Sequence, residues 1–289
     1  MKTFKYIIMP GTSILAIIFT LSSCQKGFDD KSYAPKKPLA KFDGYSNSKD
    51  IRPEALVAYW PFNGTLADSL STTAGAGTGT SFAAGTKGQS LVAPGSTYLV
   101  TNTPDAVKAL KDFTISVWVK MPLNTGAAGI VSVAHKSNFW GNFDMFFDNG
   151  GNATTGKLTI HVFNNASLAD APNNGSSNAW EAGYSVPNPW DKWTHIVATY
   201  TGNTVKVYYN GASVGSNTVA GFGPLDWSQA GQMVFGTLQF QTTPSLTTGS
   251  GAQDWAAGVN GAIDQVRIYN VALTASQIDG LYNLEKAGR

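Results

Sequence analysis

From residue 55 onward, the sequence alternates short runs of β-branched and aromatic residues with turns rich in Gly, Asn and Ser. The clearest run covers residues 113–120. Its odd-numbered positions are all apolar, and its even-numbered positions are polar apart from Trp118. A period of two places these two sets on opposite faces of an extended chain, so this run predicts a β-strand with one buried face.

Ten such runs follow one another with no helical pattern between them, which favours an all-β sandwich. Residues 201–203 and 210–211 have the composition of tight hairpin turns. One helix is predicted, over residues 275–284, where Thr274 and Gln277 form a capping box. The predicted strands are 55–62, 97–101, 113–121, 129–135, 142–147, 157–163, 193–200, 204–209, 232–240 and 262–270.

The charge balance argues against a nucleic-acid partner. The chain has 20 basic and 18 acidic residues, and Lys2 and Lys5 are the only charges before Cys24. The part after Cys24 is therefore neutral and offers no general attraction for a phosphate backbone. Cys24 is also the only cysteine, which excludes an internal disulfide and a thiolate metal cluster.

The N-terminus has the pattern of a targeting segment. Residues 1–23 combine a basic start with an apolar run too short to span a bilayer, which predicts a signal peptide. The following Leu-Ser-Ser-Cys resembles the lipobox of bacterial lipoproteins, which implies that Cys24 is lipidated and anchors the chain to the outer membrane of a Gram-negative cell. An ordinary secretory signal with a stray cysteine is the alternative.

The stretch after Cys24 refines this expectation. Asp29 and Asp30 resemble the acidic tag that exports some lipoproteins to the cell exterior, although a short polar tether would look similar. Residues 24–54 are rich in charge and proline, which predicts a flexible linker.

Four segments in order are similar to laminin-G-like domains of the concanavalin A-like lectin/glucanase superfamily. They are ALVAYWPFNG at 55–64 with Asp68, FTISVWVK at 113–120, the pair 193–200 and 205–211, and GAIDQVRIYNVALT at 261–274. The resemblance implies a two-sheet antiparallel jelly-roll β-sandwich over residues 55–289 with a short C-terminal helix, and a first strand paired with the last. The superfamily contains lectins, glycoside hydrolases, adhesion domains and spacers.

The carboxylates do not predict a glycoside hydrolase, which needs two of them within about 10 Å. Glu54, Glu181 and Glu285 are the only glutamates, and the paired-Glu strand of the superfamily's glucanases is absent. Asp144 and Asp148 would share a strand face, but four residues separate them by roughly 13 Å. The three histidines fall on separate predicted strands, with no Gly-x-Ser-x-Gly turn. We therefore expect no catalytic activity.

A calcium site is a further expectation. Asp264 is in period with the apolar Ala262 and Val266, so its carboxylate needs a partner if that face is buried. Pairing of the first and last strands would bring Asp68 close to Asp264, and Asn63 would add an oxygen suited to Ca²⁺. The alternative is that Asp68 caps a turn and that backbone amides or a salt bridge hold Asp264. No His/Cys cluster supports zinc.

The tryptophans are the clearest indication of a ligand. Trp60, Trp118 and Trp193 belong to predicted strands and are expected to pack within the fold. Five others fall in turn-rich segments, where an indole can stack on a sugar ring. These candidate carbohydrate-binding residues are Trp140, Trp180, Trp190, Trp227 and Trp255.

The sequence thus predicts a non-catalytic surface lipoprotein that captures polysaccharide, in association with glycan-uptake machinery. The alternatives are a structural or adhesion module that contacts another protein and, second, a glycoside hydrolase of the same fold.

Overall fold

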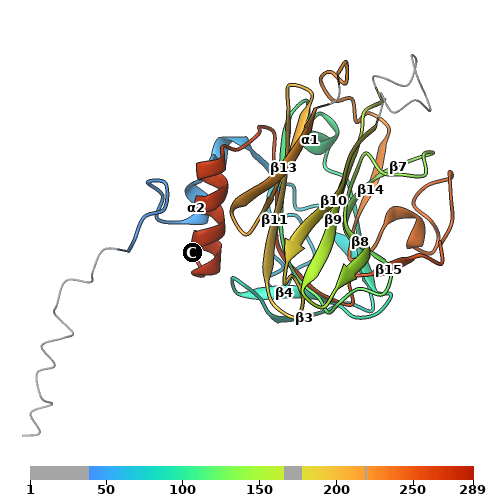
Figure 1. Cartoon of the computed structure of the whole chain (residues 1–289), viewed down its shortest axis with the longest axis horizontal. Helices are drawn as coiled ribbons and strands as arrows, with labels where there is room; N and C mark the ends of the chain where they lie inside the picture. The colour runs from blue at the N-terminus through green and yellow to red at the C-terminus, as the bar shows by residue number, and fades with distance from the viewer. Residues whose placement is uncertain (1–38, 166–177, 219) are drawn as a thin grey trace, which may run out of the picture. The chain divides into compact units, whose positions relative to one another are not determined.

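The computed structural model describes residues 39–165, 178–218 and 220–289. They form two packed β-sheets (Figure 1), antiparallel throughout except for the short β15, which pairs parallel to β7. Across sheet I the strands are β13 (Ala212–Thr218), β12 (Thr204–Tyr209), β11 (Thr194–Thr201), β6 (Phe113–Lys120), β16 (Gly261–Tyr269), β4 (Gln89–Ala93) and β3 (Ser81–Ala84), and β1 (Leu56–Trp60) also pairs with β16. Across sheet II they are β10 (Asn178–Pro187), β9 (Thr155–Phe163), β8 (Phe143–Asn152), β7 (Ala127–His135), β14 (Ala230–Phe235), β5 (Tyr98–Asn102) and β2 (Gly75–Thr78), and β15 (Ala256–Gly258) pairs with β7. The helical segments are α1 (Asp105–Lys108), α2 (Ala275–Lys286) and the 3₁₀ turns η2 (Ser48–Asp50), η3 (Pro53–Ala55) and η5 (Gln239–Gln241).

The hydrophobic core lies between the two sheets. The apolar set of β6, from Phe113 to Val119, is fully buried there and faces the apolar sets of β8 and β9. Trp60 adds its ring against Phe235 at 5.1 Å between centroids. The predicted sandwich is therefore confirmed, with the period-two strand at its centre.

Local sequence signals place the turns correctly. Both predicted hairpins form, and their turns use positive φ at Gly202, Asn203, Asn210 and Gly211, as type I′ geometry requires. The first and last strands also pair, with Tyr59 opposite Arg267.

Two kinds of strand prediction were wrong. Residues 232–240 are not one strand, because β14 ends at Phe235 and Gly236 turns the chain with a φ of 97°. Strands β2, β3, β4, β10, β13 and β15 were not predicted. Sequences such as GAGT in β2 and SFAA in β3 lack the β-branched residues on which the pattern depends.

Helix α2 covers part of the outer face of sheet I. Its predicted capping box between Thr274 and Gln277 is present. The ring of Tyr282 stacks on Trp118 of β6 at 5.5 Å. Glu285 accepts hydrogen bonds from the Trp118 indole (2.7 Å) and from Arg267 of β16 (2.7 Å), and Arg267 and Glu285 are both buried. The helix is thus fixed by an ion pair beneath it as well as by apolar contact.

The folded unit begins before residue 55, which corrects the predicted linker of residues 24–54. Residues from Ala40 onward form one compact unit. In Figure 1 this blue segment lies beside the red helix α2, where Ile51 is buried and the Ser48 hydroxyl donates to the Arg289 carbonyl. A segment this short and irregular has no periodic pattern of apolar residues, so the sequence could not reveal that it packs against the domain.

The predicted signal peptide (1–23), the proposed lipidation site Cys24 and the linker up to residue 38 lie outside the described residues. Within the part that is described, no helix is long and apolar enough to cross a membrane.

Candidate functional site

The outer face of sheet I is only partly covered by α2. The segment leading into the helix contacts β6 at Thr114, whose hydroxyl bonds to the Val271 carbonyl and the Leu273 amide. The end of the helix reaches Trp118. Two residues further along β6, on the same face of the sheet, Lys120 is exposed. The sheet surface at this end therefore remains open.

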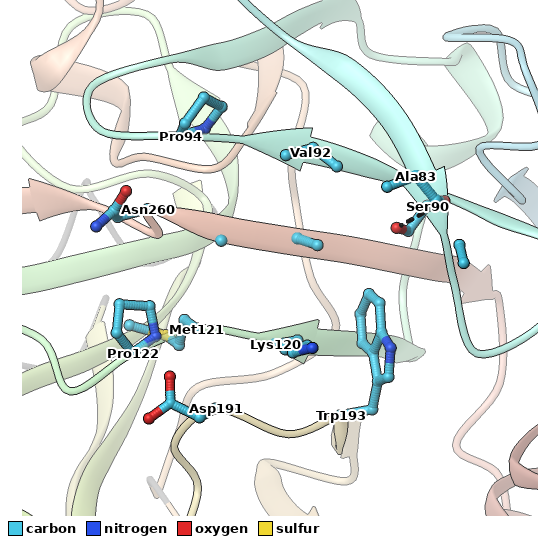
Figure 2. Close-up of a pocket in the computed structure, with 13 residues that line it drawn as sticks. Ala83, Ser90, Val92, Pro94, Lys120, Met121, Pro122, Asp191, Trp193 and Asn260 are labelled. Atoms are coloured by element: carbon cyan, nitrogen blue, oxygen red, sulfur yellow. Dashed lines mark hydrogen bonds between the residues drawn. The ribbon is translucent and has the colours of Figure 1, made fainter.

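A hollow of about 300 Å³ lies on this open surface. Figure 2 shows β4, β16 and β6 running side by side beneath it, with Trp193 at one end and Asn260 and Pro94 at the other. The small Ala262 of β16 lies opposite both Val92 of β4 and Lys120 of β6. Because the alanine side chain is only a methyl group, the surface is hollow at this position. The complete lining is Ala83, Ala84, Ser90, Val92, Pro94, Lys120, Met121, Pro122, Asp191, Trp193, Asn260, Gly261 and Ala262.

A second hollow, of about 490 Å³, adjoins the first at Trp193, which lines both. It lies at the C-terminal end of α2, and the aromatic pair Trp118 and Tyr282 forms part of its lining together with Lys286. We call the two hollows together the Trp193 groove. The second hollow is lined by Gly85, Thr86, Trp118, Lys192, Trp193, Asn210, Tyr282 and Lys286.

The loop that carries Trp193 is firmly held. Trp190 is buried against Phe147, and its indole N–H donates to the Asn152 carbonyl at 2.6 Å. The Asp191 amide donates to the Met121 carbonyl at 2.8 Å, and Asp191 adopts a positive φ of 58°. Trp193 is half-buried and comes directly before β11. These contacts fix the position of Trp193 without a ligand.

The groove combines an aromatic side chain with several polar groups. An indole between two hollows presents an apolar surface, and hydrogen-bonding groups surround it. Asp191 is the only carboxylate that lines either hollow, and glycoside hydrolysis needs two. A larger hollow of about 870 Å³ includes Asn102 and Gln232 in its lining but no aromatic side chain on which a sugar could stack.

Two of the predicted loop tryptophans have structural roles. Trp227 is completely buried, stacks near Phe113 and donates its indole N–H to the Phe163 carbonyl at 3.0 Å. Trp190 anchors the loop described above. These contacts leave neither indole face available to a ligand. Trp180 lies in β10 opposite His161, and its side chain is outside the described part.

Trp140 and Trp255 are brought together on the outer side of sheet II. Their ring centroids lie 6.0 Å apart, and Trp140 stacks on Phe146 of β8 at 5.6 Å. Trp255 is 37% exposed, whereas Phe146 and Phe240 beneath it are buried. We call these residues, with Phe139, the Trp140 cluster. It is a second aromatic surface, but none of its rings lines a described hollow.

Asp144 and Asp148 contact different partners. Asp144 is buried, accepts from the Ser132 hydroxyl at 2.6 Å and lies 3.3 Å from the His161 ring. Asp148 instead pairs with Lys157 at 2.8 Å. Each carboxylate is thus held by a side chain of a neighbouring strand.

The three histidines lie on β7, β9 and β11, as expected. His195 is completely buried, and its ring bonds to the Ser116 hydroxyl at 2.8 Å. Burial and the nearby Arg267 lower the pKa of His195 to about 3, so this ring is neutral at physiological pH. Its hydrogen bond holds β6 against β11.

The contacts of the predicted calcium ligands do not fit a shared metal site. Both oxygens of Asp68 accept hydrogen bonds from backbone amides, Oδ1 from Tyr59 of β1 at 2.7 Å and Oδ2 from Ser71 of its own turn at 2.9 Å. Asp264 accepts from the Thr86 amide at 2.7 Å, and Asn63 from the Gln89 amide at 2.6 Å. N–H groups directed at an oxygen occupy the lone pairs that a cation would need. These contacts match the alternative of a turn cap and amide-held carboxylates.

Trp193 is the candidate site residue that sequence reasoning missed. It was expected to pack within the fold because residues 193–200 have a strand pattern, yet β11 begins at Thr194. The neighbouring Pro187 and Pro189, and Asp191 two residues before it, are the signal that the chain is still in a loop here.

Comparisons with known proteins agree with this architecture. The sequence profile of the concanavalin A-like lectin/glucanases superfamily (Laminin_G_3) matches residues 94–279. No curated protein shows significant sequence similarity to the chain.

Several solved structures share the fold. Domain 4 of AbnA, a GH43 extracellular arabinanase from Geobacillus stearothermophilus, solved in complex with arabinotriose, is 23% identical with a TM-score of 0.52. That match covers 78% of this chain and 97% of the AbnA domain. The ligand-binding domain of botulinum neurotoxin serotype D, in complex with N-acetylneuraminic acid, is 13% identical with a TM-score of 0.53. Here the match covers 82% of this chain and 52% of the neurotoxin chain, about half its length.

Proposed function

Because the chain belongs to the concanavalin A-like lectin/glucanase superfamily, we propose that it is a non-catalytic carbohydrate-binding protein whose ligand occupies the Trp193 groove. The observation that carries the proposal is the half-buried Trp193 between two hollows on the face of sheet I. The AbnA domain and the neurotoxin domain, which bind arabinotriose and N-acetylneuraminic acid, show that this fold can hold sugars.

The groove suits a sugar chain for a physical reason. A pyranose or furanose ring has an apolar C–H face that stacks on an indole, while its hydroxyls need hydrogen-bond partners at the edge. Ala262 and Val92 leave room for the ring beside Trp193, and Asp191 and Asn260 supply polar groups at the margin. Because the groove is open, it fits an internal segment of a polysaccharide as well as a chain end.

We further propose that Cys24 is lipidated and that the domain is anchored to the outer membrane of a Gram-negative cell, facing outward. The lipobox-like sequence and the acidic Asp29 and Asp30 support this proposal. In that position the protein would hold polysaccharide close to an uptake or degradation complex. No calcium ion enters this mechanism, because the contacts of Asp68 and Asp264 do not fit one.

Affinity electrophoresis tests the function. Residues 25–289 are run through gels that contain neutral or acidic polysaccharides, beside W193A and W255A. For a glycan that retards the wild type, we expect W193A to weaken binding at least about tenfold, as central aromatic contacts commonly do. W255A removes the same side chain from an exposed site on the other sheet and should bind normally.

The other outcomes are equally informative. Loss of binding in W255A but not in W193A would move the ligand to the Trp140 cluster. If no glycan retards the wild type, the carbohydrate proposal is wrong, and the adhesion module becomes the better interpretation.

A further inference from the structure

The charge around Trp193 is uneven. Lys120 lines the first hollow, and Lys192 and Lys286 line the second. All three are exposed, and within the described part of the chain none of them forms an ion pair. Asp191 is the only carboxylate in the lining, and it belongs to the first hollow. A chain with balanced total charge therefore has a local excess of cations at this groove.

The excess is concentrated on the second hollow, which has two lysines and no carboxylate in its lining. The nearby carboxyl groups of Glu285 and Asp264 already have partners within the protein. Glu285 is paired with the buried Arg267, and Asp264 accepts the amides of Thr86 and Lys87. The ammonium groups of Lys192 and Lys286 are therefore free to meet an anion from solvent.

Lys286 is also held in place. Its ammonium donates to the Tyr282 hydroxyl at 3.1 Å and lies 5.2 Å from the centre of the same ring. This ring stacks on Trp118 at the edge of the hollow. A partly ordered cation beside an aromatic surface loses little further freedom when a ligand binds.

From these observations we propose that the Trp193 groove is selective for an acidic polysaccharide, with one sugar stacked on Trp193 and the anionic group of a neighbouring sugar between Lys192 and Lys286. This inference rests on the proposed function and adds the ligand class to it. The shared chemistry is a sugar with a carboxylate or a sulfate group, since an ammonium group binds either. The first hollow, where Asp191 balances Lys120, takes the uncharged part of the chain.

The test uses pairs of ligands that differ only in charge. Residues 25–289 are run in gels with polygalacturonate and with highly methyl-esterified pectin, which has the same backbone but few free carboxylates. Dextran sulfate and dextran form the second pair. The protein variants are K192Q/K286Q and, as a matched control, K136Q/K206Q, which removes two exposed lysines that line neither hollow of the groove.

We expect polygalacturonate, dextran sulfate or both to retard the wild type more than the uncharged counterpart. K192Q/K286Q should weaken this binding about 3- to 10-fold at low salt, the size expected for two exposed ion pairs, and added salt should reduce the difference. K136Q/K206Q should match the wild type. Retardation by only one of the two anions identifies carboxylate or sulfate as the group recognised.

Equal retardation by charged and uncharged ligands, or equal loss in both lysine variants, would overturn the selectivity while leaving the proposed function intact. If no polysaccharide retards the protein, the proposed function fails and the inference fails with it.

Discussion

Trp190 and Trp193 show how closely spaced residues acquire opposite roles. Trp190 is buried with its indole N–H bonded to a carbonyl, whereas Trp193 borders both hollows of the groove. The buried indole fixes the loop, and the fixed loop presents the second indole to the ligand. A tryptophan in a loop is therefore not by itself evidence of ligand contact, since packing takes up some of these side chains.

Asp264 is a second residue whose environment decides its chemistry. Its carboxyl group is completely buried, and burial raises its pKa to about 7 despite hydrogen bonds from the amides of Thr86, Lys87 and Gln265. In the unfolded chain its pKa is near 3.8. The folded protein therefore holds this proton more tightly than the unfolded chain does.

This difference predicts a pH dependence of stability. Between about pH 4 and pH 7 the unfolded chain loses the proton and the folded protein keeps it, so the free energy of unfolding falls as pH rises, by roughly 1.4 kcal/mol per unit at most. D264N cannot ionise and should lack this contribution. We expect the urea-unfolding free energy of D264N to lack this fall, so that the wild-type value minus the D264N value decreases as pH rises from 4 to 7. Parallel curves for the two proteins over this range would contradict the assignment.

At the scale of elements, α2 decides how much of sheet I is accessible. Twelve residues of helix extend about 18 Å, whereas the eight residues of β6 extend about 26 Å. The segment from Val271 into α2 follows β6 from Thr114 to Trp118, and the position of Lys120 stays uncovered. The first hollow of the groove lies on the part of the sheet beyond the helix, and the second lies at the C-terminal end of α2.

The buried pair of Arg267 and Glu285 should hold this helix in place. In E285Q the guanidinium of Arg267 loses its partner while remaining buried, which commonly costs about 3–5 kcal/mol. We expect a clear decrease in the midpoint of urea unfolding. The matched control is E54Q, which breaks the pair between Arg52 and Glu54 at the surface and should leave the midpoint unchanged. A similar effect in both variants would mean that the buried pair does not stabilise the helix.

At the scale of the whole molecule, the two ends of the folded unit support each other. Ile51 packs with Leu281 and Leu284 of α2, and Ser48 contacts both Arg267 and Arg289. The segment before β1 is thus an integral part of the domain that covers sheet I.

This arrangement predicts the result of truncation. A fragment that begins at residue 55 should be less stable than one that begins at residue 40, because it loses the buried Ile51 and leaves Arg267 without the Ser48 hydroxyl. Burial of one such side chain contributes about 1.5–3 kcal/mol, so we expect thermal unfolding to shift down by at least about 4 °C. Identical melting temperatures for the two fragments would show that residues 40–54 are the linker that the sequence pattern predicted.

Much of the fold was determined by the sequence alone. The period-two pattern of residues 113–120, the two hairpin turns and the cap at Thr274 all act through neighbouring residues, and the structure has each of them. Local backbone geometry and the alternation of side chains between two faces are sufficient to specify such features, although in β6 both faces are buried up to Lys120.

Only the tertiary structure decided where a ligand could bind. The groove requires β4, β16 and β6 to lie side by side, although β4 and β16 are far apart along the chain. It also requires α2 to end before it covers Lys120. Whether a tryptophan is buried, like Trp227, or available, like Trp193, depends on which distant residues pack against it. Packing between segments remote in sequence leaves no periodic trace in the chain, and for this reason the groove became apparent only in the folded molecule.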